Sequence, residues 1–364
     1  MSYPVAKGWP RFISPQSTIS DAELRALKQA GFDHIRLLID PEIYLEETQP
    51  HRKELDNRLL TLIGRVHMAG LNVLAVNFTR HTARNWKPEK IFTTKTDPNY
   101  QAFSNHVTHI AQLLNRFEKH QVRYVMVSEP QKECFLEPTT GKTDWLVFQR
   151  DLYARTRTVA PHLWLGLTGG CYSAIDGLDK LTMDGFDSET FVDVHFYSPF
   201  TFTHQGATWS LPAQRYIAGL TYPSKKGKLE AVKHLIDKMY AKQPSDIKNL
   251  YEAHERAREY LSYTIDSNTI KSYFVTLEAW RKRENISRER IAIGEFGALR
   301  PSPLLGQSSQ ESRLNWLHDT RRIMEEFGYS WSMWDYFPPF SLLKDTQTRT
   351  LDIPTLKALG LNAQ

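Results

Sequence analysis

Two glutamates, far apart in the chain, each follow a run of β-forming residues. Glu129 comes shortly after the apolar run 122–127, and Glu295 closes the segment Ile-Ala-Ile-Gly-Glu at 291–295. A retaining glycosidase needs two such carboxyl groups, because one protonates the leaving oxygen while the other attacks the anomeric carbon. The pair therefore predicts glycoside hydrolysis, if the fold brings both strand ends to one face.

The elements that must position these glutamates alternate along the chain. Ser20 and Glu23 form a capping box that opens a helix ending near Gly31. Strands are predicted at 11–13, 34–39, 71–76, 122–127, 163–167, 191–197, 291–295 and 329–334. Further helices are predicted at 55–69, 99–120, 144–159, 229–240, 247–282 and 311–327. Eight alternating units predict the α/β class and a single (β/α)8 TIM barrel.

One connection is much longer than the others. It runs from the end of the sixth strand at Tyr197 to the next strand at Ile291, where a single helix would suffice. We expect one catalytic barrel over residues 1–364, with an insertion at about 198–285 inside it. The first part, 198–228, follows a strand and should lie over the active face.

Polar and aromatic residues gather at the predicted strand ends, where barrel enzymes carry their reactive groups. These positions hold Arg36, Glu129, His195, Tyr197, Glu295 and Trp334. Taken singly, each has a structural explanation, such as a buried ion pair or a core ring. Together they favour a functional site, because burying six such groups without use would cost several kcal/mol of desolvation.

The charge of the chain gives little sign of a nucleic-acid partner. The net charge is +5 and the densest basic run, 281–290, mixes both signs. This run leads into a strand, so it should lie on the face opposite the active site as solvated surface. The lysines at 225–228 follow a strand; they form a solvated loop or contact an anionic glycan. No apolar stretch approaches the length of a membrane span.

Cys134 and Cys171 are the only cysteines. Each follows a predicted strand, so both could lie on the same face of the barrel. Two free thiols are the default expectation, and a bridge in an oxidising compartment is the alternative. The first residues do not form a signal peptide, so we expect a cytoplasmic protein or one whose leader has been removed.

The strand-end motifs resemble glycoside hydrolase family 5, the large cellulase family of retaining β/α barrels. The resemblance extends from about Gly8 to Leu361 and includes motifs from bacterial endoglucanases. They are His-Ile-Arg-Leu at 34–37, Ser-Glu-Pro at 128–130, His-Phe-Tyr at 195–197, Phe-Thr-His-Gln-Gly-Ala-Thr-Trp at 202–209, Gly-Glu-Phe-Gly at 294–297, Trp-Ser-Met-Trp-Asp at 331–335 and Ala-Leu-Gly-Leu at 358–361.

This resemblance implies a double displacement. Glu129 matches the acid/base of the family and Glu295 its nucleophile. Tyr197 would donate a hydrogen bond to Glu295, and Arg36 would help to keep that carboxyl ionised. The mechanism needs one carboxyl group protonated and the other ionised, and no cofactor or metal.

Further residues are expected to bind substrate by the same resemblance. His195 would line the cleavage subsite, and Trp334 would stack under the sugar. His204 and Trp209 lie in the motif of the insertion and are expected to contact the glycan.

Two positions depart from the family pattern. Ser128 stands where the family has an asparagine that contacts the sugar 2-hydroxyl, and Phe78 stands where it commonly has a histidine. His81 lies close by in the sequence and is a candidate replacement for that histidine. Since hydrogen bonds to the 2-hydroxyl strengthen in the transition state, these changes indicate a preferred substrate other than ordinary cellulose.

The resemblance thus implies an endo-β-1,4-glucanase-like hydrolase acting on a β-linked polysaccharide or oligosaccharide. The alternatives are a β-mannanase or a bacterial exopolysaccharide depolymerase. From another class, a catalytically impaired barrel that only binds glycan stays open. We expect a monomer with no nucleic-acid or membrane partner. The family implies a secreted or periplasmic protein, and a cytoplasmic location also stays open.

Overall fold

The computed structural model describes residues 2–4, 19–46, 49–79, 86–131, 145–301 and 309–362. Its main sheet has eight strands hydrogen-bonded in chain order, with β1 to β6 pairing in parallel. The strands are β1 (Ser2–Pro4), β2 (His34–Ile39), β3 (Asn72–Phe78), β4 (Val122–Ser128), β5 (Trp164–Leu167), β6 (Thr190–Phe196), β7 (Ile291–Phe296) and β8 (Ser330–Met333). Parallel strands in this order form a nearly closed barrel, so the predicted TIM-barrel fold is confirmed.

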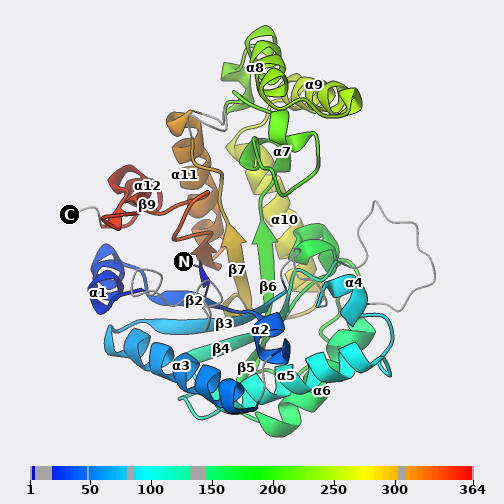
Figure 1. Ribbon diagram of the computed structural model, residues 1–364, viewed down its shortest axis with the longest axis vertical. Coiled ribbons are helices and arrows are strands. Elements are labelled where there is room, and N and C mark those ends of the chain that lie inside the picture. Colours follow the sequence, from blue (N-terminus) through cyan, green and yellow to red (C-terminus); the bar gives the residue numbers. More distant parts are fainter. Residues whose placement is uncertain are drawn as a thin grey trace. The chain divides into compact units, whose positions relative to one another are not determined.

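Helices alternate with these strands (Figure 1). They are α1 (Asp21–Ala30), α2 (Pro41–Glu46), α3 (Gln49–Met68), α4 (Pro88–Ile91), α5 (Pro98–Leu114), α6 (Trp145–Val159), α7 (Phe200–Thr203), α8 (Leu229–Lys242), α9 (Ile247–Ser262), α10 (Ser267–Arg283), α11 (Gln310–Glu326) and α12 (Ile353–Ala358). A short hairpin, β9 (Leu343–Asp345) with β10 (Thr350–Leu351), precedes α12.

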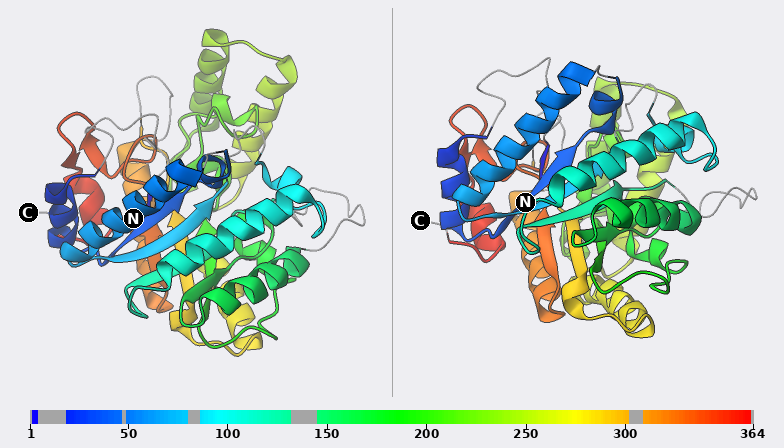
Figure 2. Two further views of the ribbon diagram at one scale, coloured as in Figure 1. Left: turned by 60° about the horizontal axis from the view of Figure 1, so that its bottom comes forward. Right: turned by 90° about the horizontal axis from the view of Figure 1, so that it is seen from below.

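The chain divides into two compact units. Unit 1 comprises residues 1–195 and 280–294, and unit 2 comprises residues 196–279 and 295–364. In unit 1, α3, α5 and α6 cover the outer side of the strands, as two further views also show (Figure 2). In unit 2, α8 and α9 pack side by side within the insertion. The organisation of the chain as one catalytic domain stays a prediction.

Local signals explain where α1 begins and ends. The Ser20 side chain accepts a hydrogen bond from the Glu23 amide, and the Glu23 carboxylate accepts one from the Ser20 amide. Gly31 follows the helix at φ 104°, a left-handed conformation that glycine adopts readily. Both the predicted start and the predicted end are confirmed.

The structure corrects two predicted helices. The helix predicted at 247–282 is two helices, α9 and α10, because Tyr263 is extended and Asp266 caps a new start by accepting the amide of Asn268. The helix predicted at 99–120 ends at Leu114. The first strand lies at Ser2–Pro4, and the prediction at 11–13 falls outside the described residues.

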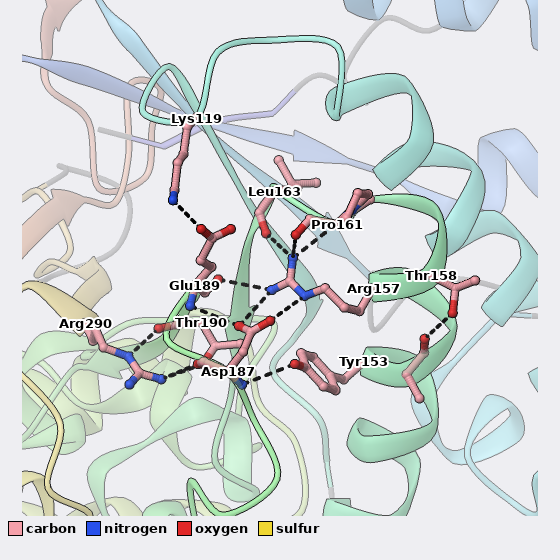
Figure 3. A network of polar contacts seen from close by, with 12 residues as sticks. Lys119, Tyr153, Arg157, Thr158, Pro161, Leu163, Asp187, Glu189, Thr190 and Arg290 are labelled. Carbon is pink, nitrogen blue, oxygen red and sulfur yellow. Dashed lines mark hydrogen bonds and ion pairs between the residues drawn. The ribbon is translucent and has the colours of Figure 1, made fainter.

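A polar network joins the N-terminal ends of β5 and β6 to their neighbours in unit 1 (Figure 3). Arg157 of α6 donates to the carbonyl oxygen of Leu163 at 2.7 Å and to Asp187 Oδ1 at 3.1 Å. Arg290, from the basic run of the sequence, donates to the carbonyl oxygen of Thr190 at 2.6 Å. The face at the N-terminal ends of the strands contributes to stability in β/α barrels, so these hydrogen bonds indicate a structural role for Arg290.

Cys171 is disulfide-bonded, so the expectation of two free thiols is wrong. The other cysteine of the sequence, Cys134, lies outside the described residues. Within the described ranges, no helix combines the length and the apolar character that a membrane span requires.

Candidate active site

The end of β4 is shaped to present Glu129. Between Val76 and Phe78 of β3 the register with β4 shifts, so that β4 contains one extra residue before Ser128. Such a bulge redirects the side chains that follow it. Glu129 itself has φ 51°, an uncommon conformation for a residue with a side chain. Strained backbone of this kind concentrates at functional sites, where the surrounding structure holds it in place.

The segment after β5 supports this strained backbone. Three successive residues, Cys171 to Ser173, have positive φ values of 46°, 58° and 59°. The resulting turn lets Ser173 Oγ accept a hydrogen bond from the Glu129 amide at 3.1 Å. The Tyr172 amide donates to the Pro130 carbonyl oxygen at 3.1 Å, so the two strand ends are tied together.

Glu129 belongs to a polar cluster in unit 1 that also contains Arg36, Ser128, Asp193 and His195. His195 Nδ1 lies 2.9 Å from Glu129 Oε1. On the other side of the ring, His195 Nε2 lies 3.2 Å from Arg36 Nη2 and 3.4 Å from Asp193 Oδ2. Arg36 also donates to Ser128 Oγ at 3.2 Å. Side chains from β2, β4 and β6 therefore form one connected polar cluster with Glu129.

Burial within this cluster is graded. The side chains of Arg36 and Asp193 are 0% exposed and that of His195 is 2% exposed, whereas that of Glu129 is 18% exposed. Glu129 is thus the member that solvent or a substrate can reach. Arg36 and Asp193 lie next to His195, and His195 contacts Glu129, so these two buried groups are linked to Glu129 through the His195 ring.

In unit 2, Glu295 stands in β7 and is almost fully buried. The Tyr197 hydroxyl donates a hydrogen bond to Glu295 Oε2 at 2.8 Å. Thr203 Oγ1 donates to the Tyr197 carbonyl oxygen at 2.6 Å, which holds the segment after β6 in place. Bonds to ionised acceptors are among the strong ones, so this arrangement favours the carboxylate form of Glu295.

Aromatic rings line the same part of unit 2. Tyr197 and Trp334 pack against a small buried cluster that contains Phe340. The His204 ring stacks on Phe200 at 4.0 Å and meets the Tyr197 ring edge-on at 5.0 Å. Trp209 is 52% exposed. Trp334 is partly exposed. Exposed or partly exposed rings such as Trp209 and Trp334 suit the apolar faces of sugars.

Arg313 anchors the segment that carries Phe340. It is fully buried and donates to the carbonyl oxygens of Ala298 and Phe340, at 3.0 and 2.6 Å, and to Thr355 Oγ1 at 2.8 Å. Burial lowers the pKa of Arg313 to about 9, so it stays charged at neutral pH. Its fork of donors fixes three separate stretches of unit 2.

A cavity of about 570 Å³ lies elsewhere in unit 1. Its walls come from α2, α3 and α5 together with Trp86, and none of the predicted site residues lines it. His106, one of its lining residues, bonds to Asn77 Oδ1 through Nε2 at 3.1 Å. Burial lowers the pKa of His106 to about 3, which makes it a neutral structural group.

The predicted site residues thus fall into two sets, one in each unit. Arg36, Ser128, Glu129 and His195 meet in unit 1, whereas Tyr197, His204, Trp209, Glu295 and Trp334 belong to unit 2. His81 lies outside the described residues.

Sequence reasoning missed Asp193, Ser173 and Phe340. The period-two pattern of a strand could have revealed Asp193, because it points to the same side as His195. Turns bring Ser173 and Phe340 to the site, and the geometry of those turns cannot be predicted from the sequence.

Comparison with known proteins gives a family match over most of the chain. The model of the family described as Cellulase (glycosyl hydrolase family 5) matches residues 4–338. Endoglucanase C of Acetivibrio thermocellus is 26% identical over 325 residues, covering 87% of this chain and 84% of that protein. Endoglucanase 3 of Fibrobacter succinogenes is 24% identical over 361 residues, covering 95% of this chain and 50% of its own length.

Solved structures show the same fold. A hyperthermophilic endo-β-1,4-glucanase in complex with substrate superposes with a TM-score of 0.69 at 22% identity, covering 98% of this chain and 95% of that one. Cel5A of Thermotoga maritima in complex with mannotriose gives 0.67 at 20% identity, covering 94% and 90%. With a family model that spans nearly its whole length, this chain belongs to the cellulase family, glycosyl hydrolase family 5.

Proposed function

We propose that this protein is a retaining endo-β-glycanase of the endo-β-1,4-glucanase type. The observation that carries the proposal is that two glutamates at strand ends of the barrel are each held by a neighbouring ring. Glu129 is held by His195 and Glu295 by Tyr197. Membership of a cellulase family and similarity to two endoglucanases support the same activity.

In the first step, Glu295 attacks the anomeric carbon while Glu129 gives its proton to the glycosidic oxygen, and the bond between that carbon and oxygen breaks. A glycosyl–enzyme ester on Glu295 results. In the second step, Glu129 takes a proton from water, the resulting hydroxide attacks the anomeric carbon, and Glu295 leaves as a carboxylate. No cofactor enters this scheme.

The remaining residues are assigned to binding. Trp334 and Trp209 would stack on sugar rings, and His204 would support the Tyr197 ring. Arg36, which bonds to Ser128 and His195, would orient the residues around Glu129. A role for His81 stays a prediction from sequence.

A second candidate substrate is a β-mannan or a bacterial exopolysaccharide. Its support is Ser128, whose hydroxyl accepts a hydrogen bond from Arg36 and stands where the family has an amide. A side chain that reaches less far toward the 2-hydroxyl suits sugars that differ at that carbon. One structural neighbour, Cel5A of Thermotoga maritima, was solved with mannotriose.

For the compartment we propose secretion or the periplasm. The disulfide at Cys171 supports this assignment, because disulfides persist in oxidising compartments. We further propose a monomer without nucleic-acid or membrane partners.

The proposal is tested by measuring reducing ends released from soluble β-glucans, β-mannans and acidic exopolysaccharides. We expect release from at least one polymer by the wild type and none by Glu295→Ala. A folded wild-type protein that binds these polymers and cuts none would contradict the proposal and favour a glycan-binding barrel.

A further inference from the structure

The cavity of about 570 Å³ in unit 1 lies at the end of the strands that carries Glu129. Its walls come from α2, the start of α3, part of α5 and Trp86. α2 directly follows β2 and packs against α5, and Trp86 lies in the connection after β3. Segments that follow a strand begin at its carboxyl end, and Glu129 directly follows β4. The cavity is therefore outside the strands, on the face of unit 1 that carries Glu129.

The inner wall of the cavity is connected to the strand that leads to Glu129. His106 Nε2 lies 3.1 Å from Asn77 Oδ1, and Asn77 Nδ2 donates to the carbonyl oxygen of Met126 at 3.1 Å. Asn77 is fully buried, and Met126 belongs to β4. These bonds hold the wall in place without a ligand. Sites for small molecules are usually preformed in this way and have volumes of ~300–1,000 Å³, a range that includes this cavity.

Other lining residues offer groups that match a sugar. Trp86 is partly exposed and Asn105 is exposed. Within the described part of the chain, neither the Trp86 indole nor the Asn105 side-chain amide has a hydrogen-bond partner. The two carboxylate oxygens of Asp56 lie 2.9 and 3.0 Å from His109 Nε2, so each side chain holds the other in position. An indole ring suits the apolar face of a sugar, and amide and carboxylate groups suit its hydroxyls.

The charges around the cavity favour an anionic sugar over a neutral one. Lys53 is exposed and, among the described residues, has no ion-pair partner. Arg52 also lines the cavity and donates to the carbonyl oxygen of Leu45 at 3.3 Å, which keeps this cation at the wall. Asp56 is the one carboxylate among the described lining residues, and His109 already contacts it. Positive charge is therefore in excess, and a carboxylate on the ligand would compensate it.

We propose that this cavity is a second carbohydrate site, separate from the cleavage site, that binds a uronic acid residue of an acidic polysaccharide. Trp86 stacks on the sugar ring, Asn105 bonds to its hydroxyls, and Lys53 pairs with its carboxylate. No bond is made or broken there. The choice of a sugar as the ligand rests on the proposed function, because a glycan hydrolase meets such a ligand in its substrate. A bound chain is thereby kept at a high local concentration on the face that carries Glu129.

The test follows the indole N–H signal of Trp86 by nitrogen-15 NMR of the full chain, so that binding in the cleavage site does not enter the readout. The signal that disappears in Trp86→Phe belongs to Trp86. Two disaccharides serve as probes: cellobiose, and cellobiouronic acid, in which the terminal glucose is replaced by glucuronic acid. At low ionic strength, we expect cellobiouronic acid to half-saturate the shift at about tenfold lower concentration than cellobiose. A signal that does not move, or that responds equally to both probes, would overturn the proposal.

Lys53→Gln tests the charge that selects the acidic probe. We expect the preference for cellobiouronic acid to fall to about threefold or less, while the affinity for cellobiose stays the same. Lys119→Gln is the matched control, because Lys119 pairs with Glu189 at the opposite end of the strands in the same unit (Figure 3). It removes the same charge and should leave the preference unchanged. A full preference in Lys53→Gln, or an equal loss in Lys119→Gln, would contradict the proposed site.

This titration measures binding and needs no turnover, so the two proposals can fail separately. If the wild type releases no reducing ends from any polymer, the proposed function fails, and the Trp86 signal still decides whether the cavity binds an acidic sugar. If the wild type cleaves a polymer and the Trp86 signal does not respond to cellobiouronic acid, the proposed function stands and the second site is refuted.

Discussion

Replacing Tyr197 by phenylalanine isolates one hydrogen bond of the site. The change removes the hydroxyl that donates to Glu295 Oε2 at 2.8 Å and keeps the ring. The ring should stay in place, because it packs against His204 at 5.0 Å and Phe340 at 5.9 Å. Any effect then reports the bond itself.

The magnitude follows from the charge of the acceptor. A hydrogen bond to an ionised group contributes about 1.5–3 kcal/mol and one to a neutral group about 0.5–1.5 kcal/mol. The difference of about 1–1.5 kcal/mol stabilises the carboxylate over the protonated form and corresponds to about one pH unit. Losing it makes Glu295 take up a proton at higher pH. We therefore expect the acidic limb of kcat/KM to move upward by about one unit.

The assay is kcat/KM against pH on an aryl cellobioside and on a soluble glucan. Both substrates need the nucleophile, so the acidic limb should move equally for both. Tyr329→Phe is the matched control, because the Tyr329 hydroxyl donates to the buried Glu278 at 2.7 Å outside the predicted site. An acidic limb that does not move in Tyr197→Phe, or that moves as much in Tyr329→Phe, would refute the reasoning.

Three further changes have defined outcomes. Glu129→Ala should lower kcat/KM on glucan by about 10²–10⁴-fold and spare an activated aryl glycoside in its first step; equal losses would argue against an acid role. The pKa of His106 is about 3 in the folded protein. As pH falls, His106 takes up a proton in the unfolded chain at a higher pH than in the folded protein. The free energy of unfolding should therefore fall as pH drops below about 6.5. Between about pH 7 and 5, the free energy of urea unfolding of His106→Gln should fall by about 2 kcal/mol less than that of the wild type. An unchanged pH dependence would contradict this. Arg313→Lys should cost about 2–4 kcal/mol of unfolding free energy, since lysine cannot replace the fork, and no loss would contradict the anchoring role.

Periodicity and strand-end residues were sufficient to predict the barrel. The apolar runs before Glu129 and Glu295 are buried strands, and the capping box at Ser20 begins a helix as expected. Apolar runs and capping residues involve only a few neighbouring positions, so they can be recognised directly in the sequence. The break between α9 and α10 was missed because both sides read as helix, and the turn depends on tertiary contacts such as that of the Ser224 hydroxyl with the Tyr263 carbonyl oxygen.

The residues of the candidate site could be predicted from the sequence, but the hydrogen bonds that connect them could not. Sequence singled out Arg36, Ser128 and His195, yet it could not tell that Arg36 bonds to both of the others. The support of Glu129 by Ser173 depends on three consecutive left-handed residues, none of which is glycine. Such conformations are set by the surrounding fold and leave no sequence pattern.

The central claim is a retaining mechanism, and proton NMR of the first product tests it most directly. A soluble β-1,4-linked oligosaccharide that the protein cleaves is followed from the first turnovers, before mutarotation mixes the anomers. Double displacement through Glu295 predicts that the β-anomer appears first. Initial release of the α-anomer would show inversion and contradict the roles given to Glu129 and Glu295.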